Sequence, residues 1–194
     1  MTTAPTSPPR SFTPEDLDDM PDAVRFELAD GELVERNLSA YTAAVAFELN
    51  GLMRPSIRAA GGFGGGADFG LQIFVLQPGR VVKPDGCYLS AARLPSGLPA
   101  NGWCRVAPDL AFEVVLPNDR AEDVEAKVRD YLAAGVLLVW VVYPATRSVT
   151  VHHPDGTAIS LAGDARLTGE DILPGFATKV SELFPPVHAT PATE

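Results

Sequence analysis

A single acidic residue, Glu113, interrupts an apolar segment that runs from Leu110 to Leu116. The segment is typical of a strand, in which alternate side chains point to opposite faces of the sheet. Glu113 then shares a face with Ala111 and Val115, while Phe112 points the other way. Burying an ionised carboxylate is costly unless it is paired or binds a metal. The residue is therefore either a metal ligand or a glutamate that is salt-bridged or exposed at a sheet edge.

A second carboxylate, Asp85, follows Pro84 in the preceding expected strand, Val81 to Leu89. Carboxylates on neighbouring strands can point into one cleft and hold Mg²⁺, a hard cation that usually takes only one or two protein carboxylates. The alternative is that Pro84, Asp85 and Gly86 form a turn or a bulge at the end of a strand.

A cationic residue, Lys127, lies on the helix expected after the Glu113 strand. The helical period places it about 100° from Val128, at the border of the apolar face. From there the long side chain can extend its ammonium group back toward the sheet. A solvated surface lysine is the alternative.

The elements that must position these residues follow from capping, turn and periodicity patterns. A short helix is expected after Thr13, the N-cap, and Pro14, the first helical residue. Hairpins are expected around Asp30-Gly31 and Pro154-Asp155-Gly156. The other expected elements are a helix from Ser39 to Arg54 that ends at Pro55, strands Leu71 to Leu76 and Val136 to Val142, a helix Ala121 to Ala134 that Gly135 closes, and a short helix from Ser181 to Phe184.

The glycine-dense stretch 61–70 contains GGFGGG and is expected to be a flexible loop. It lacks the lysine of a phosphate-binding Walker motif, and no strand–loop–helix context follows.

Composition places the chain of 194 residues among ordinary globular proteins, with residues 11–184 as one domain and 1–10 and 185–194 as flexible tails. No apolar run reaches the ~20 residues of a membrane span. Two cysteines, Cys87 and Cys104, predict reduced core thiols and a cytoplasmic location. The net charge of −10 argues against broad electrostatic binding to nucleic acid.

The ordered set of motifs resembles the Uma2 family (DUF820) of restriction-endonuclease-like proteins in the PD-(D/E)XK nuclease superfamily. The resemblance covers most of the chain, from Thr13 to Phe184. The matching residues are Phe26 to Val34, Val82 to Asp85, Pro108 to Val115, Lys127, Tyr131, Gly135-Val136, Trp140, Pro144, Leu173 to Phe176 and Leu183-Phe184.

This resemblance implies an α/β fold with a restriction-endonuclease-like central mixed sheet, flanked by helices and carrying added β-hairpins. It implies that Asp85 and Glu113 hold Mg²⁺ or Mn²⁺. Val115 stands where the superfamily's usual lysine is found, so Lys127 is expected to supply the amine. Glu32 is a further candidate for an auxiliary acid.

The chain departs from the family pattern at several polar positions. Leu116-Pro117 replaces a Ser-Pro pair, Leu138 replaces a glutamate, and Tyr143 replaces an aspartate before proline. Tyr41 lies where a histidine often opens the first long helix. Groups around metal ligands orient them, so these changes affect rate and substrate choice.

The leading functional hypothesis is a metal-dependent endonuclease that acts on nucleic acid, with DNA favoured as the substrate. The alternative is a catalytically weak or inactive nuclease-fold protein that serves in protein interaction or self-association. Hydrolysis of some other substrate is a third hypothesis. A homodimer is expected from the available hairpin edges.

Overall fold

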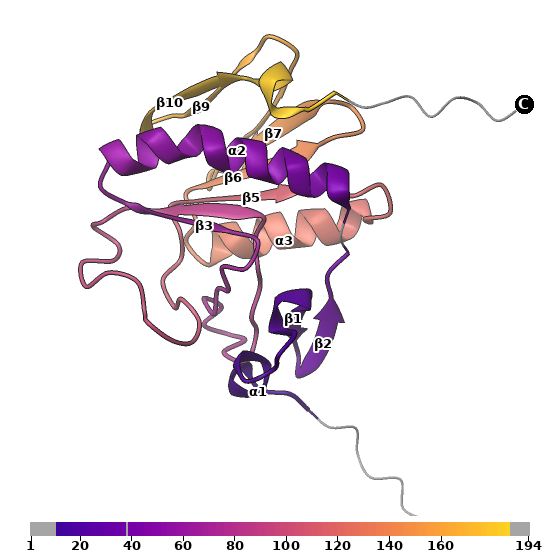
Figure 1. The fold of residues 1–194 in the computed structure, drawn as a ribbon, viewed down its shortest axis with the longest axis vertical. Coiled ribbons are helices and arrows are strands. Elements are labelled where there is room, and N and C mark those ends of the chain that lie inside the picture. The colour runs from indigo at the N-terminus through magenta and orange to yellow at the C-terminus, as the bar shows by residue number, and fades with distance from the viewer. Residues whose placement is uncertain (1–10, 38, 187–194) are drawn as a thin grey trace, which may run out of the picture.

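A mixed sheet with strand order β3-β4-β5-β6-β7-β8 forms the centre of this computed structural model, which describes residues 11–37 and 39–186 (Figure 1). Its strands are β3 (Phe63–Gly66), β4 (Gly86–Leu89), β5 (Leu110–Val114), β6 (Leu138–Tyr143), β7 (Ser148–His152) and β8 (Ala158–Ala162). Strands β5 and β6 are parallel, and every other neighbouring pair is antiparallel. This architecture confirms the predicted fold class.

The alternation predicted for the Glu113 strand is present in β5. Phe112 and its even-numbered neighbours pack into an apolar cluster with α2 (Ala40–Ala59). Ala111 packs into a second cluster on the opposite face, with residues of α3 (Ala121–Ala133). Figure 1 shows α2 and α3 on either side of the sheet. Since α3 connects the parallel strands β5 and β6, it lies directly over the face that carries Glu113.

Helix α2 extends beyond Pro55, so the predicted end of this helix is wrong. Proline removes one backbone donor, which leaves the Gly51 carbonyl without its helical partner. Gly51 and Pro55 are both exposed, so water can bind that carbonyl. Met53 and Ile57 are buried, and their packing keeps the last turns helical.

The prediction that residues 61–70 form only a loop is also wrong, because Phe63–Gly66 is the edge strand β3. Its glycines allow close packing under α2: a Cβ on Gly64 would lie 3.1 Å from Ile57 Cδ1. The strands predicted at Leu71 to Leu76 and Val81 to Leu89 shrink to isolated bridges and to β4. Pro84 interrupts the second segment and lacks the N–H that a continuous ladder needs.

Hairpins extend the structure at both ends of the chain. Strands β1 (Phe26–Ala29) and β2 (Glu32–Glu35) pair around the predicted turn, where Asp30 and Gly31 have φ of 51° and 78°. Helix α1 (Pro14–Asp18) begins at the predicted N-cap, Thr13. Strands β9 (Arg166–Gly169) and β10 (Leu173–Lys179) form a hairpin near the C-terminal end. There are also two short 3-10 helices, η1 (Ala23–Arg25) and η2 (Val180–Leu183).

The β9–β10 hairpin was not expected from the sequence pattern. Its turn has no Asn-Gly or Asp-Gly pair, and a register shift separates Leu173 from Ala177. The hairpin is held by packing: Phe176 stacks on Trp140 of β6 with ring centroids 5.4 Å apart.

Both cysteines are buried and free of disulfides, as predicted. No helix among the described residues is long and apolar enough to cross a membrane. The tail predicted at residues 1–10 and most of that at 185–194 lie outside the described residues. Pro185, at the start of the second, accepts a hydrogen bond of 3.3 Å from the Tyr41 hydroxyl.

The close approach of β4 to its neighbours yields the first prediction. A Cβ on Gly86 would lie 2.2 Å from Phe112 Cε1 and 2.6 Å from Asn50 Oδ1. We expect Gly86→Ala to lower the free energy of unfolding by about 1–3 kcal/mol, because the buried ring must move. Urea unfolding measures this change. The matched control is Gly51→Ala, which adds a methyl group to an exposed helical position with nothing within 4 Å and should raise stability by about 0.5–1 kcal/mol. Equal midpoints for Gly86→Ala and wild type would contradict the prediction.

Candidate active site

Glu113 points from β5 toward α3, where two side chains contact its carboxylate. The Tyr131 hydroxyl donates to Oε1 at 2.7 Å, and Lys127 Nζ lies 3.4 Å from Oε2. The Glu113 side chain is only 13% exposed. The structure therefore brings Glu113 and Lys127 together, and the partners of Glu113 come from successive turns of one helix face.

Burial raises the pKa of Glu113 from its ordinary value of 4.5 to about 7. The Lys127 ammonium opposes this rise, whereas the neighbouring carboxylates of Asp85 and Glu27 add to it. The effect of Asp85 and Glu27 on Glu113 indicates that the three carboxylates form one cluster. Such a cluster gains from a further positive charge, either a proton or a cation.

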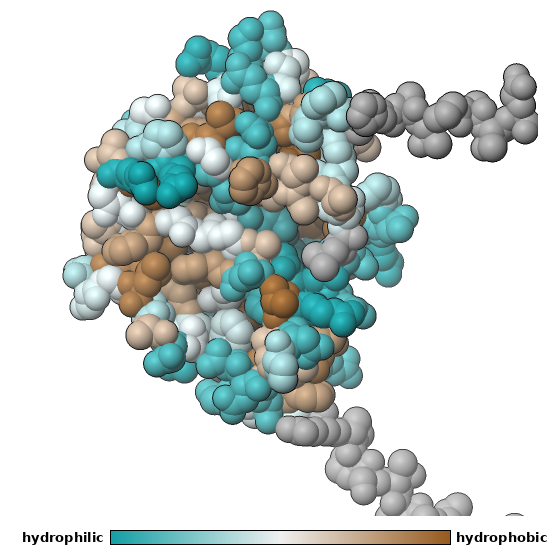
Figure 2. All heavy atoms as spheres, in the orientation of Figure 1, coloured by the Kyte–Doolittle hydropathy of each residue, from teal (hydrophilic) through white to brown (hydrophobic). Residues whose placement is uncertain are grey.

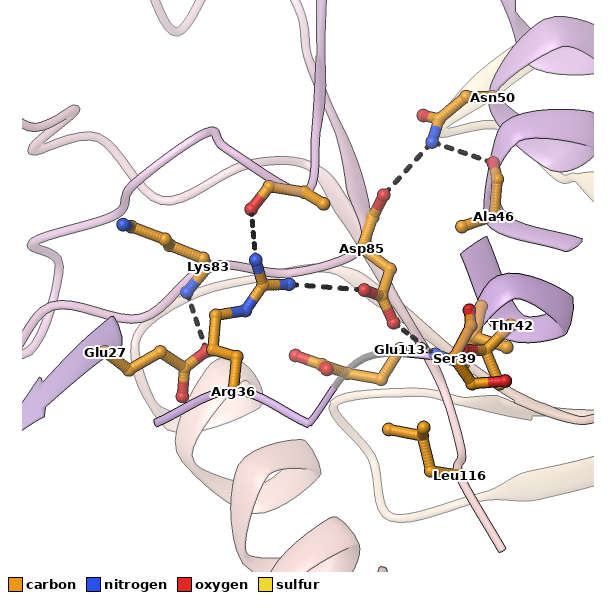
Figure 3. Close-up of polar contacts among 12 residues, drawn as sticks. Glu27, Arg36, Ser39, Thr42, Ala46, Asn50, Lys83, Asp85, Glu113 and Leu116 are labelled. Atoms are coloured by element: carbon orange, nitrogen blue, oxygen red, sulfur yellow. Dashed lines mark hydrogen bonds and ion pairs between the residues drawn. The ribbon is translucent and has the colours of Figure 1, made fainter. Parts of the chain in front are cut away.

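Asp85 precedes β4 directly, and neighbouring elements hold it in place. Val114 N donates to its Oδ2 at 2.7 Å, and its own carbonyl accepts a hydrogen bond of 3.0 Å from Asn50 Nδ2 of α2. Arg36 lies 3.4 Å from Oδ1, an approach that Figure 3 shows beside Glu113. Burial raises the pKa of Asp85, against the effects of the Val114 hydrogen bond and Arg36.

Lys127 connects Glu113 to a third carboxylate, Glu27 of β1. Its Nζ lies 3.2 Å from Glu27 Oε1, and the same oxygen accepts a hydrogen bond of 2.9 Å from Lys83 N. Burial disfavours the charged form of Lys127, but the attraction of Glu113 and Glu27 is larger in sum and raises its pKa. The group is therefore an ammonium ion at neutral pH.

Sequence reasoning named Glu32 as the auxiliary acid, and the structure does not bring Glu32 to this cluster. Glu32 is exposed on β2, and within the described part of the chain its side chain has no hydrogen bond or ion pair with Asp85, Glu113 or Lys127. Glu27 of the paired strand occupies the cluster instead, with only 8% of its surface exposed. A short amphipathic strand gives no local signal for this burial, because it depends on contact with α3.

Arg36 was also missed, because it follows the hairpin in a segment with no regular pattern. Its position depends on the route of the chain from β2 to α2. There the Arg36 guanidinium donates a hydrogen bond of 2.8 Å to the Ala67 carbonyl and also approaches Asp85. Tyr131 packs in the buried cluster between α3 and the sheet, and its hydroxyl reaches Glu113 from there.

The donor set at this cluster fits a hard divalent cation. Glu113 of β5 and Asp85, which directly precedes the neighbouring strand β4, offer carboxylate oxygens, and carboxylates are the protein ligands that Mg²⁺ prefers. The described residues contain no group of three or more His, Cys, Asp or Glu side chains arranged to hold a metal. The fit is thus to an ion that keeps several waters, and not to a closed protein cage.

A groove of about 670 Å³ lies between α2 and β3, and it reaches the cluster through Arg36, Asp85 and Val114. Glu113 and Lys127 line a separate, smaller hollow of about 120 Å³ on the α3 side. Asp85 is therefore accessible from the large groove, whereas Glu113 is reached from the smaller hollow.

The pairing of Lys127 with two carboxylates yields the second prediction. At pH 8 and in the presence of a chelator, we expect Lys127→Met to lower the free energy of unfolding by about 1–3 kcal/mol. This is less than the ~3–5 kcal/mol for breaking a fully buried pair, because 32% of the Lys127 side chain is exposed. Removing the ammonium raises the pKa of Glu113 further above 4.5. The folded state then binds a proton more tightly than the unfolded chain does, and the loss of stability should shrink as the pH falls from 8 to 5.

Urea unfolding at the two pH values measures this loss. Arg129→Met is the matched control, since Arg129 is an exposed cation of the same helix. A loss that is the same at pH 5 and pH 8 would show that Lys127 does not compensate a titrating carboxylate.

Comparison with known proteins agrees with this architecture. The model of the Uma2 family, described as "Putative restriction endonuclease", matches residues 14–181. A solved structure from Anabaena variabilis, described as "a putative nuclease belonging to DUF820", is 16% identical in sequence and superposes with a TM-score of 0.74, covering 89% of this chain and 97% of that one. No curated protein matches the sequence. Since the family model spans nearly all of the described residues, the chain belongs to the Uma2 family.

Proposed function

We propose that this protein hydrolyses phosphodiester bonds in nucleic acid, with DNA as the favoured substrate, and that Asp85 and Glu113 hold Mg²⁺ or Mn²⁺ for the reaction. The observation that supports the proposal best is the contact between the buried Glu113 carboxylate and the half-buried Lys127 ammonium, with Asp85 at the start of the neighbouring strand β4 close enough to raise the pKa of Glu113. A cluster of this kind is costly to fold, which favours a role that requires it.

The protein's own groups fix the two carboxylates before any ligand arrives. The Val114 N–H holds one oxygen of Asp85, and the Tyr131 hydroxyl holds one oxygen of Glu113. A bound divalent cation would orient and acidify a water and offset charge on the phosphodiester. Preorganised ligands require little rearrangement when the ion binds, and this lowers the cost of reaching the reactive geometry.

Lys127 acts as a fixed positive charge and hydrogen-bond donor. Because its pKa is raised, it does not accept a proton at neutral pH. Its ammonium is suited to position the attacking water or to stabilise the negative charge that develops on the phosphate. Glu27 contributes by orienting this ammonium together with Glu113.

The alternative use of the fold, self-association without catalysis, is favoured by one observation. Strand β8 is an edge of the sheet, and its Ile159 is 51% exposed. An exposed apolar edge strand can pair with the same strand of a second copy. Self-association through β8 does not require the acidic cluster. If this is the protein's role, substitutions at Asp85 should leave self-association unchanged.

Nuclease assays on DNA and RNA with Mn²⁺ or Mg²⁺ test the proposal. We expect Asp85→Asn and Lys127→Met each to reduce the cleavage rate by about 10²-fold or more, as is typical when a group that stabilises transition-state charge is lost. Glu48→Gln is the matched control, since Glu48 is exposed on α2 away from the cluster, and it should cleave as wild type does.

Identical residual cleavage by wild type and Asp85→Asn would indicate a contaminating nuclease and contradict the proposal. Calorimetric titration with Mn²⁺ supplies a second readout, in which Asp85→Ala should bind more weakly than wild type. The single variants Glu27→Gln and Glu32→Gln, compared in parallel, decide which acid assists the reaction. We expect the cleavage rate to fall for Glu27→Gln. A fall in the rate for Glu32→Gln alone would assign the role to Glu32.

A further inference from the structure

The groove beside α2 carries a row of side chains of which only Asn50 contacts the catalytic cluster, through the Asp85 carbonyl. Phe47, Asn50, Arg54 and Arg58 are spaced three or four residues apart, so they lie along one face of the helix. All four line the groove. Phe47 is 80% exposed, which is unusual for a phenyl ring that could have been buried against the neighbouring apolar core.

The charge of the groove is opposite to that of the whole chain. Arg36, Arg54 and Arg58 line it, and Asp85 is the acidic side chain among its lining residues. The chain as a whole carries a net charge of −10. Arg36 is engaged with Asp85, whereas Arg54 and Arg58 have no side-chain hydrogen bond or ion pair to any described residue. These two guanidinium groups are exposed and available to phosphates.

The wall opposite α2 is formed by the glycines of β3. Gly64, Gly65 and Gly66 line the groove, and a Cβ on Gly66 would have no atom within 4 Å. The side chains of Ile57 and Phe69 lie against Gly64 and Gly65, whereas at Gly66 the space is open and a ligand backbone can approach the strand closely. Figure 2 shows this face, on which strongly hydrophilic residues adjoin paler and apolar ones. The groove therefore offers an aromatic ring, two free cations and an open approach to the backbone at Gly66.

We propose that this groove binds a single strand of nucleic acid, with a base stacked on Phe47 and with phosphates held by Arg54 and Arg58, and that it leads the strand to Asp85. An exposed aromatic ring next to cations is the combination that single-strand-binding proteins use. A duplex stacks its bases internally and does not present their faces to such a ring. The volume of about 670 Å³ also suits a short stretch of one strand.

Only the last step, delivery to Asp85, depends on the function proposed above. Strand binding by the groove is a property of α2 and β3 and does not require the reaction. Binding is therefore measured in the absence of divalent cations, and cleavage is measured separately in their presence.

The experiment is fluorescence anisotropy with a labelled oligodeoxynucleotide, as a single strand and as the matching duplex, in a chelating buffer at several salt concentrations. We expect wild type to prefer the single strand. Phe47→Ala should weaken single-strand binding by about 10-fold or more through the loss of stacking. Arg54→Gln and Arg58→Gln should each weaken binding and lower the salt slope by about 0.7, the value for one phosphate contact on a single strand.

Arg129→Gln is the matched control, because it removes an exposed cation from α3 on the opposite face of the sheet and should bind as wild type does. Thermal unfolding of each variant checks that the fold is retained. Equal affinity for single strand and duplex, wild-type affinity in Phe47→Ala, or no binding of either nucleic acid would overturn the inference. Binding that fails in the groove variants, with no cleavage by any variant, would support the groove and contradict the nuclease function. Cleavage that is lost in Asp85→Asn but unchanged in Phe47→Ala and Arg54→Gln would support the nuclease function and contradict strand binding by the groove.

Discussion

The burial of the Glu113 carboxylate is the constraint on which the rest of the site depends. A charged group in the middle of a buried sheet is stable only with partners at hydrogen-bonding distance. Tyr131 and Lys127 of α3 are those partners, and they fix how the helix lies over β5. Lys127 in turn requires Glu27, so the β1–β2 hairpin is drawn against the same face. One carboxylate thereby connects the central sheet, its crossover helix and the N-terminal hairpin.

The cluster is compensated internally before a ligand binds. The cations Arg36 and Lys127 face the carboxylates Asp85, Glu113 and Glu27, which leaves an excess of negative charge. Burial is the main cause of the raised pKa of Glu113, and the charges of Asp85 and Glu27 add to it. A protein that only needed a stable core would have an apolar residue at this position, since replacing buried ion pairs by apolar side chains is often neutral or stabilising. The presence of Asp85 and Glu113 in one cluster, with Asp85 open to the groove, is the physical basis of the metal-site proposal.

The parts of this picture that sequence could predict are those controlled by local periodicity. Alternation along β5 predicted the face of Glu113, and the helical period predicted that Lys127 could reach it. Capping and turn residues predicted α1 and two of the hairpins. Features that depend on tertiary contact were missed or mistaken. Pro55 ends an isolated helix, yet α2 continues because Ile57 is buried. The glycines of β3 are typical of a loop, and they form a strand here because they pack under α2. Glu27 belongs to the site because it contacts Lys127 of α3.

The position of a bound metal ion is the most direct test of whether Asp85 and Glu113 hold Mg²⁺ or Mn²⁺. Crystals of the wild-type protein grown or soaked with Mn²⁺ would give an anomalous difference map in which manganese is identified without reference to the surrounding side chains. We predict one strong peak beside the carboxylates of Asp85 and Glu113, which would hold the ion, and the loss of this peak in Asp85→Asn. Manganese bound elsewhere, or a peak of equal height in Asp85→Asn, would contradict it.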